Sequence, residues 1–311
     1  MHHHEHETEI GARDRGLIPK FLVVLIGAAL LGLLVWGGIA LIMQVPAAFR
    51  WGVGKAIDAV PLSVDEKIGQ AAIASMDLGG ARIQTPIVDQ LCQTMLARLT
   101  PAANRNELRF RLRVIGNEQI NAFALPGGEM VVFSGLLSRA SGAEQVAGVL
   151  AHEMAHVSLR HGMLRMIQSF GIVSGMQLFL GDAGGLLALG KELFTLAAVN
   201  GYSRHQEAEA DAEALFMLAR AGVDPQPFIR FFELLQAEGQ KTPALLGWLG
   251  THPNPEERTA ALRAKLAAIP TPAQRRPIPI AWATLQQSLR TPALPAEQLP
   301  GERLPTQQAP R

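Results

Sequence analysis

No charged residue occurs between Phe21 and Met43. At a rise of about 1.5 Å per residue, a helix of this length crosses the roughly 30 Å hydrocarbon core of a bilayer. The pattern therefore predicts one transmembrane anchor over residues 21–45. A cleavable signal peptide is the alternative, but the apolar region of a signal peptide usually runs for about 7–15 residues.

Positive residues on the two sides of this stretch indicate its orientation. Arg13, Arg15 and Lys20 precede it, and Arg50 and Lys55 follow it. Positively charged flanks tend to stay on the cytoplasmic side of a membrane. We therefore expect a single-pass protein of the bacterial inner membrane, with its catalytic domain in the periplasm.

The pattern after residue 46 is mixed and predicts several elements. Helices are expected over about 65–76 and 86–99, and Ser63 is placed to cap the first of them. Apolar and basic residues then alternate from Leu108 to Val114, which is typical of a strand with one buried face. The arginines of this strand are expected to lie on its solvated face.

Residues 121–133 have the pattern of a hairpin: a short strand, a Pro-Gly-Gly turn and a second strand. An edge strand can pair with an extended peptide through main-chain hydrogen bonds, whatever the sequence of that peptide. The candidate substrate-binding residues are Asn121, Ala122, Phe123 and Ala124. A purely structural hairpin fits the spacing equally well.

The apolar residues that follow recur at helical spacing and predict a helix: Val146, Val149, Leu150, Met154 and Val157. His152 and His156 lie four positions apart within it, in the pattern H-E-x-x-H. Residues with this spacing share one helix face and lie about 6 Å apart, so two imidazoles can hold one metal ion. An accidental grouping is the alternative, and the helical context disfavours it.

This pattern has a specific chemistry. Zinc bound by two histidines and one carboxylate keeps a fourth position open for water, and the pKa of that water falls to about 7. A neighbouring carboxylate can then take the proton. The sequence therefore predicts a zinc hydrolase with one Zn²⁺ per chain and Glu153 as its base.

A later acidic segment supplies candidates for the third ligand. Glu207 and Asp211 are four positions apart and would share one helix face. Glu207 is then placed to reach the metal, while Asp211 can accept the second ring N–H of a ligand histidine and fix its tautomer. A solvated acidic helix is the alternative.

A second apolar region runs from Met163 to Val199, but Asp182, Lys191 and Glu192 interrupt it. It is a poor candidate for a membrane span. Two apolar helices folded over the active site, or lying at the membrane surface, explain the pattern. A helical hairpin in the protein core explains it equally well.

His252 lies in a Pro-containing segment, residues 250–255, which predicts a stiff loop. As a neutral ligand, His252 could fill the open metal position and hold the enzyme idle. Displaced by substrate, His252 or Arg258 could instead act in catalysis by stabilising the oxyanion. An ordinary structural histidine is the third interpretation.

Composition limits the remaining possibilities. The chain of 311 residues has a formal net charge of +1, which gives no field for nucleic acid. Its single cysteine, Cys92, excludes an internal disulfide and a Cys-rich metal site. The predicted organisation is a disordered His-rich tail over 1–20, a catalytic domain over 46–270 and a Pro-rich extended tail over 271–311, with a short helix at 281–290.

Four motifs together give the chain a resemblance to a known family. They are residues 121–128, residues 152–156 followed by Arg160-His161-Gly162, residues 203–211, and His252-Pro253 with Arg258. The chain resembles the membrane-linked gluzincin metallopeptidases, which include the CAAX prenyl endopeptidases and the HtpX, BepA-like and Oma-type proteases. It resembles the BepA-like branch most, although it is too short to carry the helical repeats of its better-known members.

This resemblance implies an α+β, predominantly helical zincin-type domain with a small sheet, and Glu207 as the third zinc ligand. The expected activity is zinc endopeptidase cleavage of protein or peptide substrates, namely misfolded or misassembled membrane and envelope proteins. A catalytically idle, chaperone-like binding protein on the same scaffold is the alternative. The sequence does not fix the oligomeric state.

Overall fold

The computed structural model describes residues 54, 57–166, 201–238, 246–252, 255–269 and 275–290. The chain divides into two units, residues 1–58 and 59–311, and nearly all described residues belong to the second. Within the described part, no helix is both long and apolar enough to cross a bilayer. The anchor predicted over 21–45 and most of the apolar region 163–199 lie outside it.

A three-stranded sheet forms one layer of the second unit, as the family resemblance implied. Its strands are β1 (Arg111–Ile115), β2 (Ala122–Ala124) and β3 (Glu129–Phe133), in the spatial order β1-β3-β2. Strand β1 is parallel to β3, whereas β2 is antiparallel to it. The predicted hairpin is therefore confirmed, and β2 lies at an edge of the sheet.

The hairpin turns through a short 3₁₀ segment, η2 (Pro126–Gly128). Gly127 has a φ of 75°, a backbone conformation that side chains disfavour. A Cβ at this position would also lie 2.3 Å from the Cα of Glu66. Glycine at position 127 is thus required both by the turn and by the helix packed against it.

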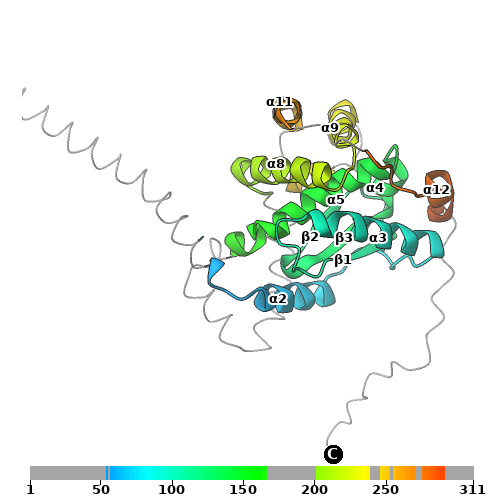
Figure 1. The fold of residues 1–311 in the computed structure, drawn as a ribbon. Helices are drawn as coiled ribbons and strands as arrows, with labels where there is room; N and C mark the ends of the chain where they lie inside the picture. Colours follow the sequence, from blue (N-terminus) through cyan, green and yellow to red (C-terminus); the bar gives the residue numbers. More distant parts are fainter. Residues whose placement is uncertain are drawn as a thin grey trace, which may run out of the picture. The chain divides into compact units, whose positions relative to one another are not determined.

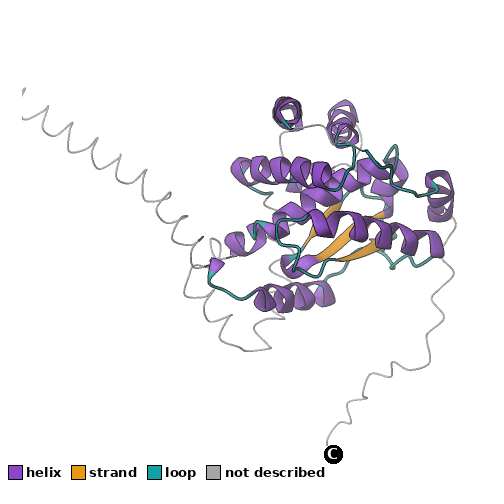
Figure 2. Cartoon of the chain, in the orientation of Figure 1, coloured by secondary structure: helices purple, strands orange, loops and turns teal. Residues whose placement is uncertain are grey.

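Helices cover both sides of this sheet (Figures 1 and 2). The helices before the metal-binding pattern are α2 (Leu62–Ser75), α3 (Pro86–Leu99) and α4 (Ser134–Arg139), with the 3₁₀ turn η1 (Thr100–Ala102) after α3. Those after it are α8 (Arg204–Arg220), α9 (Gln226–Glu238), α10 (Leu246–Thr251), α11 (Pro255–Ala268) and α12 (Trp282–Arg290). The predominantly helical fold with a small sheet agrees with the expectation.

Helix α5 (Ala143–Ser158) is the centre of the fold. It runs between β2 and α8, and all of its residues except Glu144 are buried (Figure 1). Close packing is built into it, because a Cβ on Gly148 would lie 2.3 Å from the Cβ of Phe228 on α9. A helix buried on every side holds its side chains in fixed positions, and α5 is the helix that carries the H-E-x-x-H pattern.

The start of α2 differs from the prediction. The helix begins at Leu62 after Pro61, so Ser63 lies inside it and does not cap it. The fixed φ of proline suits the position before a first helical turn, and the carbonyl of Pro61 accepts the N–H of Val64 at 3.0 Å.

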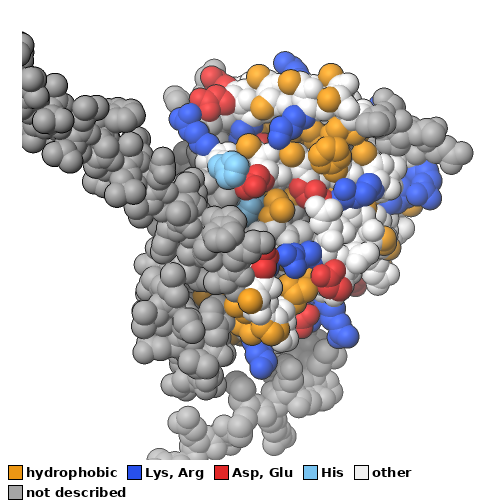
Figure 3. Space-filling model, turned by 60° about the vertical axis from the view of Figure 1, so that its left-hand side comes forward, with side chains coloured by type: hydrophobic (Ala, Val, Ile, Leu, Met, Phe, Trp, Pro, Cys, Tyr) orange, Lys and Arg blue, Asp and Glu red, His pale blue; other side chains and the backbone are white. Residues whose placement is uncertain are grey.

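The sequence predicted that the arginines of β1 lie on a solvated face, but two of them pair with a buried carboxylate. Arg111 lies 2.8 Å from the carboxylate of Glu129 on β3, and Arg113 also pairs with Glu129. Glu129 is 1% exposed, so its charge needs these partners. Figure 3 shows that basic and acidic side chains are interspersed over one face of the described part.

The packed part of the chain continues beyond residue 270, where the sequence predicted an extended tail. Ile278 and the α12 residue Leu285 are buried in the main hydrophobic core. The short helix expected at 281–290 is present, and the indole N–H of Trp282 donates to the carbonyl of Ala140 at 3.1 Å. Apolar side chains on this helix outweigh the Pro-rich composition around it.

Candidate metal centre

Helix α5 directs two imidazoles into the interior of the domain. His152 and His156 are 0% and 1% exposed, and their Nε2 atoms lie 3.0 Å apart. The four-residue spacing therefore brings both rings to one point, as the pattern predicted.

Helix α8 brings a carboxylate to the same point. Ser203 and Gln206 form a capping box that starts the helix, with the Gln206 N–H donating to Ser203 Oγ at 3.3 Å. This fixes the first turn, where Glu207 is 2% exposed. The carboxylate oxygens of Glu207 lie 3.4 Å from His156 Nε2 and 3.5 Å from His152 Nε2.

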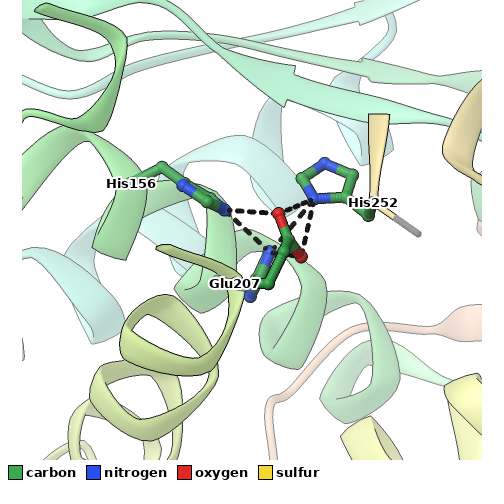
Figure 4. A group of neighbouring side chains, drawn as sticks. His156, Glu207 and His252 are labelled. Carbon is green, nitrogen blue, oxygen red and sulfur yellow. Dashed lines mark hydrogen bonds and ion pairs between the residues drawn. The ribbon is translucent and has the colours of Figure 1, made fainter. Parts of the chain in front are cut away.

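A third histidine completes the group. His252 Nδ1 lies 3.0 Å from Glu207 Oε1 (Figure 4). The same atom lies 3.3 Å from His152 Nε2. The preceding residues were expected to form a loop, but Gly250 and Thr251 end helix α10. A helix can reach this position because the first proline of the segment follows His252, so no helical N–H is lost before it.

The geometry of these four side chains fits a single metal ion. One ligand atom from each of His152, His156, Glu207 and His252 lies within 4.8 Å of all the others. A metal about 2.0–2.2 Å from four tetrahedral ligands holds the ligand atoms about 3.3–3.6 Å apart. The contacts of 3.0–3.5 Å between these side chains are close to that spacing.

Charge also suits a cation. Burial raises the pKa of Glu207, but the positive charges of His252 and Arg258 outweigh it and hold that pKa well below its usual range. Burial lowers the pKa of His156 to about 4, so its ring is neutral. Two imidazole nitrogens and an ionised carboxylate, joined by His252 once its ring loses a proton, form a donor set that zinc prefers.

Glu153 lies beside the four side chains. It is 2% exposed, and its Oε1 is 3.3 Å from His252 Nε2. Burial raises the pKa of Glu153, but the imidazoles of His252 and His152 outweigh it and bring the pKa below its usual value. The carboxylate is therefore ionised at neutral pH and able to accept a proton.

The edge strand β2 is in direct contact with Glu153. In an antiparallel pair, alternate residues direct their backbone groups at the partner strand. The Asn121 carbonyl accepts the N–H of Phe133 at 3.0 Å, so the backbone groups of Ala122 and Ala124 point to the other edge. The Ala124 N–H donates to Glu153 Oε2 at 3.1 Å.

Phe123, the remaining candidate substrate-binding residue, is half-buried. Its ring packs edge-on against that of Phe133, with the ring centroids 6.1 Å apart. The side chain of Phe123 thus stabilises the hairpin, and its backbone faces β3.

Arg258 had been considered as an oxyanion donor, and the structure shows it bound to two carboxylates. Its Nε and Nη2 donate to Asp211 at 2.8 and 2.6 Å, and Nη1 lies 2.5 Å from Glu207 Oε2. Asp211 Oδ1 in turn lies 3.0 Å from Nδ1 of His152. The predicted contact between Asp211 and a ligand histidine is present. The sequence identified Arg258 as a site residue but did not predict that it pairs with Asp211.

Two aromatic rings also escaped the sequence analysis. Tyr202 stacks on His156 with ring centroids 3.7 Å apart, and Trp248 stacks on His252 at 4.3 Å. The Tyr202 N–H donates to the Thr251 carbonyl at 3.1 Å, which ties the start of α8 to the end of α10. Tyr202 precedes Glu207 by five positions, and Trp248 precedes His252 by four. This spacing is the sequence signal that could have identified the two rings.

Comparison with known proteins agrees with this chemistry. The beta-barrel assembly-enhancing protease of Escherichia coli (strain K12) is 32% identical over 193 residues, which are 58% of this chain and 39% of that protein. The mitochondrial metalloendopeptidase OMA1 of Schizosaccharomyces pombe is 34% identical over 167 residues, 53% of this chain and 49% of that protein. The metalloprotease LoiP of Escherichia coli is 28% identical over 229 residues, 64% of this chain and 86% of that protein.

The chain spans about two fifths of the length of the relatives that match first. The profile described as Peptidase family M48 matches residues 86–266, which contain the whole of the described metal centre. This match covers more than half of the chain. The chain therefore belongs to peptidase family M48, the zinc metallopeptidases whose chemistry its buried His-His-Glu centre fits.

Proposed function

We propose that this chain is a membrane-anchored zinc endopeptidase that cleaves misfolded or misassembled membrane and envelope proteins. The observation that carries the proposal is the buried group of His152, His156 and Glu207 with the ionised Glu153 beside it. These are the residues that a hydrolase of this kind needs, in one place and in suitable charge states.

In this proposal His152, His156 and Glu207 hold one zinc ion. Bound there, zinc would supply Lewis acidity, activating water and polarising the scissile carbonyl. Glu153 takes the proton of the attacking water and later delivers it to the leaving amine. The Ala124 N–H holds one oxygen of the Glu153 carboxylate, Oε2. The other oxygen, Oε1, is directed at His252.

Asp211 and Arg258 position these groups. Asp211 holds His152 through Nδ1, which leaves Nε2 to face the metal. Arg258 pairs with Asp211 and Glu207 at once, which offsets their buried negative charge and holds the two carboxylates in place.

Substrate would bind along β2. The backbone groups of Ala122 and the carbonyl of Ala124 face away from β3 and could pair with an extended peptide, while the Ala124 N–H stays with Glu153. Such pairing selects conformation more than sequence. An unfolded segment of a protein meets this requirement, whereas a folded one does not. The contact between Ala124 and Glu153 would place the paired peptide next to the base.

His252 has a separate role in this proposal. Its Nδ1 lies within the ligand group, so a neutral His252 could fill the position that a zinc peptidase leaves open for water. We infer that His252 is a displaceable fourth ligand that keeps the resting enzyme idle. An unrestrained peptidase beside a membrane would damage its neighbours, and substrate entering along β2 would displace the imidazole.

The location follows from the sequence. Residues 21–45 would anchor the chain in the bacterial inner membrane by a single pass, with the catalytic domain in the periplasm. The name of the Escherichia coli relative links that protein to β-barrel assembly, which supports envelope proteins as the substrate class here.

The rival function is a chaperone-like protein that binds the same clients without cleaving them. To separate the two, the detergent-solubilised full chain is incubated with casein or with an unfolded membrane protein, with zinc and with a zinc chelator. The proposal predicts fragments with new termini inside the substrate sequence, formed only with zinc. Suppressed aggregation without fragments, in a chain that has zinc bound, would favour the rival.

A further inference from the structure

The two ligand histidines of α5 are held by different partners. In the His152 ring, Nε2 faces the other proposed ligands. The second ring nitrogen, Nδ1, contacts the carboxylate of Asp211. The corresponding atom of His156, Nδ1, lies 2.9 Å from Nδ1 of His161. His161 is 3% exposed, so this contact between two imidazoles is sealed from water.

The turn that follows the end of α5 at Ser158 creates this contact. In an uninterrupted helix, a residue five positions on is rotated by about 140° and faces away. Here Arg160 has a φ of 55°, which is uncommon for a residue other than glycine, and it turns the chain so that His161 returns to His156.

Buried contacts hold Arg160 in that conformation. Its guanidinium donates to the carboxylate of Asp65 on α2 and, at 2.9 Å, to the carbonyl of Val60. Asp65 and Arg160 are 2% and 3% exposed. The surrounding structure therefore stabilises a backbone conformation that the sequence alone would not favour.

The hydrogen bond between the two rings has one direction when His156 binds a metal. Its Nε2 faces the ligand group and must offer a lone pair, so the neutral ring carries its proton on Nδ1. That N–H donates, and Nδ1 of His161 accepts. His161 then carries its own proton on Nε2, which lies 3.4 Å from Glu209 Oε2.

We propose that His161, oriented by Glu209, is the positioning residue that fixes the tautomer and ring orientation of the metal ligand His156. The arrangement is a relay from a carboxylate through one imidazole to the ligand, whereas His152 has its carboxylate in direct contact. Glu209 is an acid of α8 that is not among the proposed metal ligands. In this relay it accepts the Nε2–H of His161.

The inference rests on the proposed role of His156 as a zinc ligand, so its test measures zinc binding and not proteolysis. Two variants separate hydrogen bonding from packing. In His161→Asn the amide oxygen can take the place of Nδ1, because both atoms are bonded to Cγ. His161→Leu has a similar volume but no acceptor.

Zinc affinity of the full chain is measured by competition with a chromogenic chelator, and the unfolding of each zinc-free variant is recorded alongside. We expect His161→Leu to bind zinc about 10–100-fold more weakly than wild type, and His161→Asn to recover most of that loss. Equal affinities in all three chains, or equal losses in both variants, would overturn the inference. A wild-type chain that binds no zinc would instead overturn the proposed function.

A second pair of variants guards against misfolding at the buried position. The Glu209 side chain is 45% exposed, so Glu209→Ala leaves the core intact. We expect it to lower zinc affinity about 3–10-fold, less than the loss at His161 because the carboxylate acts one residue further from the metal. Glu256→Ala, at an exposed acid of α11, is the matched control and should change nothing. Identical affinities for these two variants would contradict the relay.

Discussion

The carboxylate of Glu153 accepts a hydrogen bond from the backbone N–H of Ala124 at 3.1 Å. Ala124 lies on β2, the edge strand of the sheet, and Glu153 lies on the central helix α5. The candidate base is thus attached to the strand along which we propose that substrate binds. The two residues are 29 positions apart in the chain, and this contact gives the site a fixed geometry.

Glu153→Asp tests this contact while the negative charge is kept. The shorter side chain withdraws the carboxylate by roughly one bond length, about 1.5 Å, so it cannot hold the Ala124 N–H and reach the attacking water together. A displacement of about 1 Å can cost 10²-fold in rate, and we expect a loss of about 10- to 100-fold in kcat. Zinc affinity is measured as the control. An unimpaired kcat would show that the Ala124 contact does not set the position of the base.

Arg258→Met should destabilise the zinc-free chain. Arg258 is 7% exposed and is bound to Asp211 and Glu207, so its removal takes a shared positive charge away from two buried carboxylates. Breaking such a buried pair costs about 3–5 kcal/mol of unfolding free energy. Denaturant unfolding of the detergent-solubilised chain measures the loss.

Arg263→Met is the matched control on the same helix, because Arg263 pairs with Glu233 where the two side chains are 63% and 39% exposed. Exposed pairs contribute about 0–1 kcal/mol. Similar losses in the two variants would contradict the buried role of Arg258.

Zinc affinity should rise with pH. Burial disfavours the imidazolium of His252, but the carboxylates of Glu207 and Glu153 outweigh it and raise its pKa to about 9. Only the neutral ring can bind zinc, so below that pKa the metal must displace a proton. The affinity then increases about tenfold per pH unit for each proton displaced.

Competition titrations at pH 6, 7 and 8 measure this dependence, with circular dichroism as a check that the chain stays folded. Burial disfavours the charged form of His152, but Asp211 and Glu207 outweigh it and raise the pKa of this residue too. His152 would therefore contribute in the same direction. An affinity that stays constant or falls over this range would contradict the charge states described here.

His252→Ala separates the three possible roles of that residue. If His252 blocks the resting metal, its removal raises the basal rate of proteolysis, and this is the result we expect. If it stabilises the oxyanion, the rate falls, by about 10²-fold or more for a donor in such a site. Initial rates at equal zinc occupancy distinguish these outcomes, and an unchanged rate would leave His252 a structural role only.

Local patterns predicted the parts of the site that lie within one element. The four-residue spacing placed His152 and His156 together, and the same spacing on α8 selected Glu207 and Asp211. The hairpin was predictable because Pro-Gly-Gly, a turn-forming sequence, separates two short strand-like runs.

Contacts between distant segments could not be predicted in this way. Arg258 is 47 residues from Asp211, and the left-handed conformation of Arg160 depends on Asp65, which is 95 residues away. Arg111 likewise pairs with Glu129, whereas the alternation of apolar and basic residues alone predicted a solvated side chain. Each of these pairs exists because a buried charge requires a partner, and a periodic pattern does not show which residue will supply it.

The central claim is that Glu153 acts as the base of a zinc-dependent peptidase. Glu153→Gln tests it most directly, because the amide oxygen can still accept the Ala124 N–H while the group can no longer take a proton. The measurement is the initial rate of casein cleavage by wild type and by this variant at equal zinc occupancy. We predict a loss of at least about 10²-fold with zinc affinity unchanged. Equal rates in the two chains, or no cleavage by a wild-type chain with zinc bound, would contradict the account.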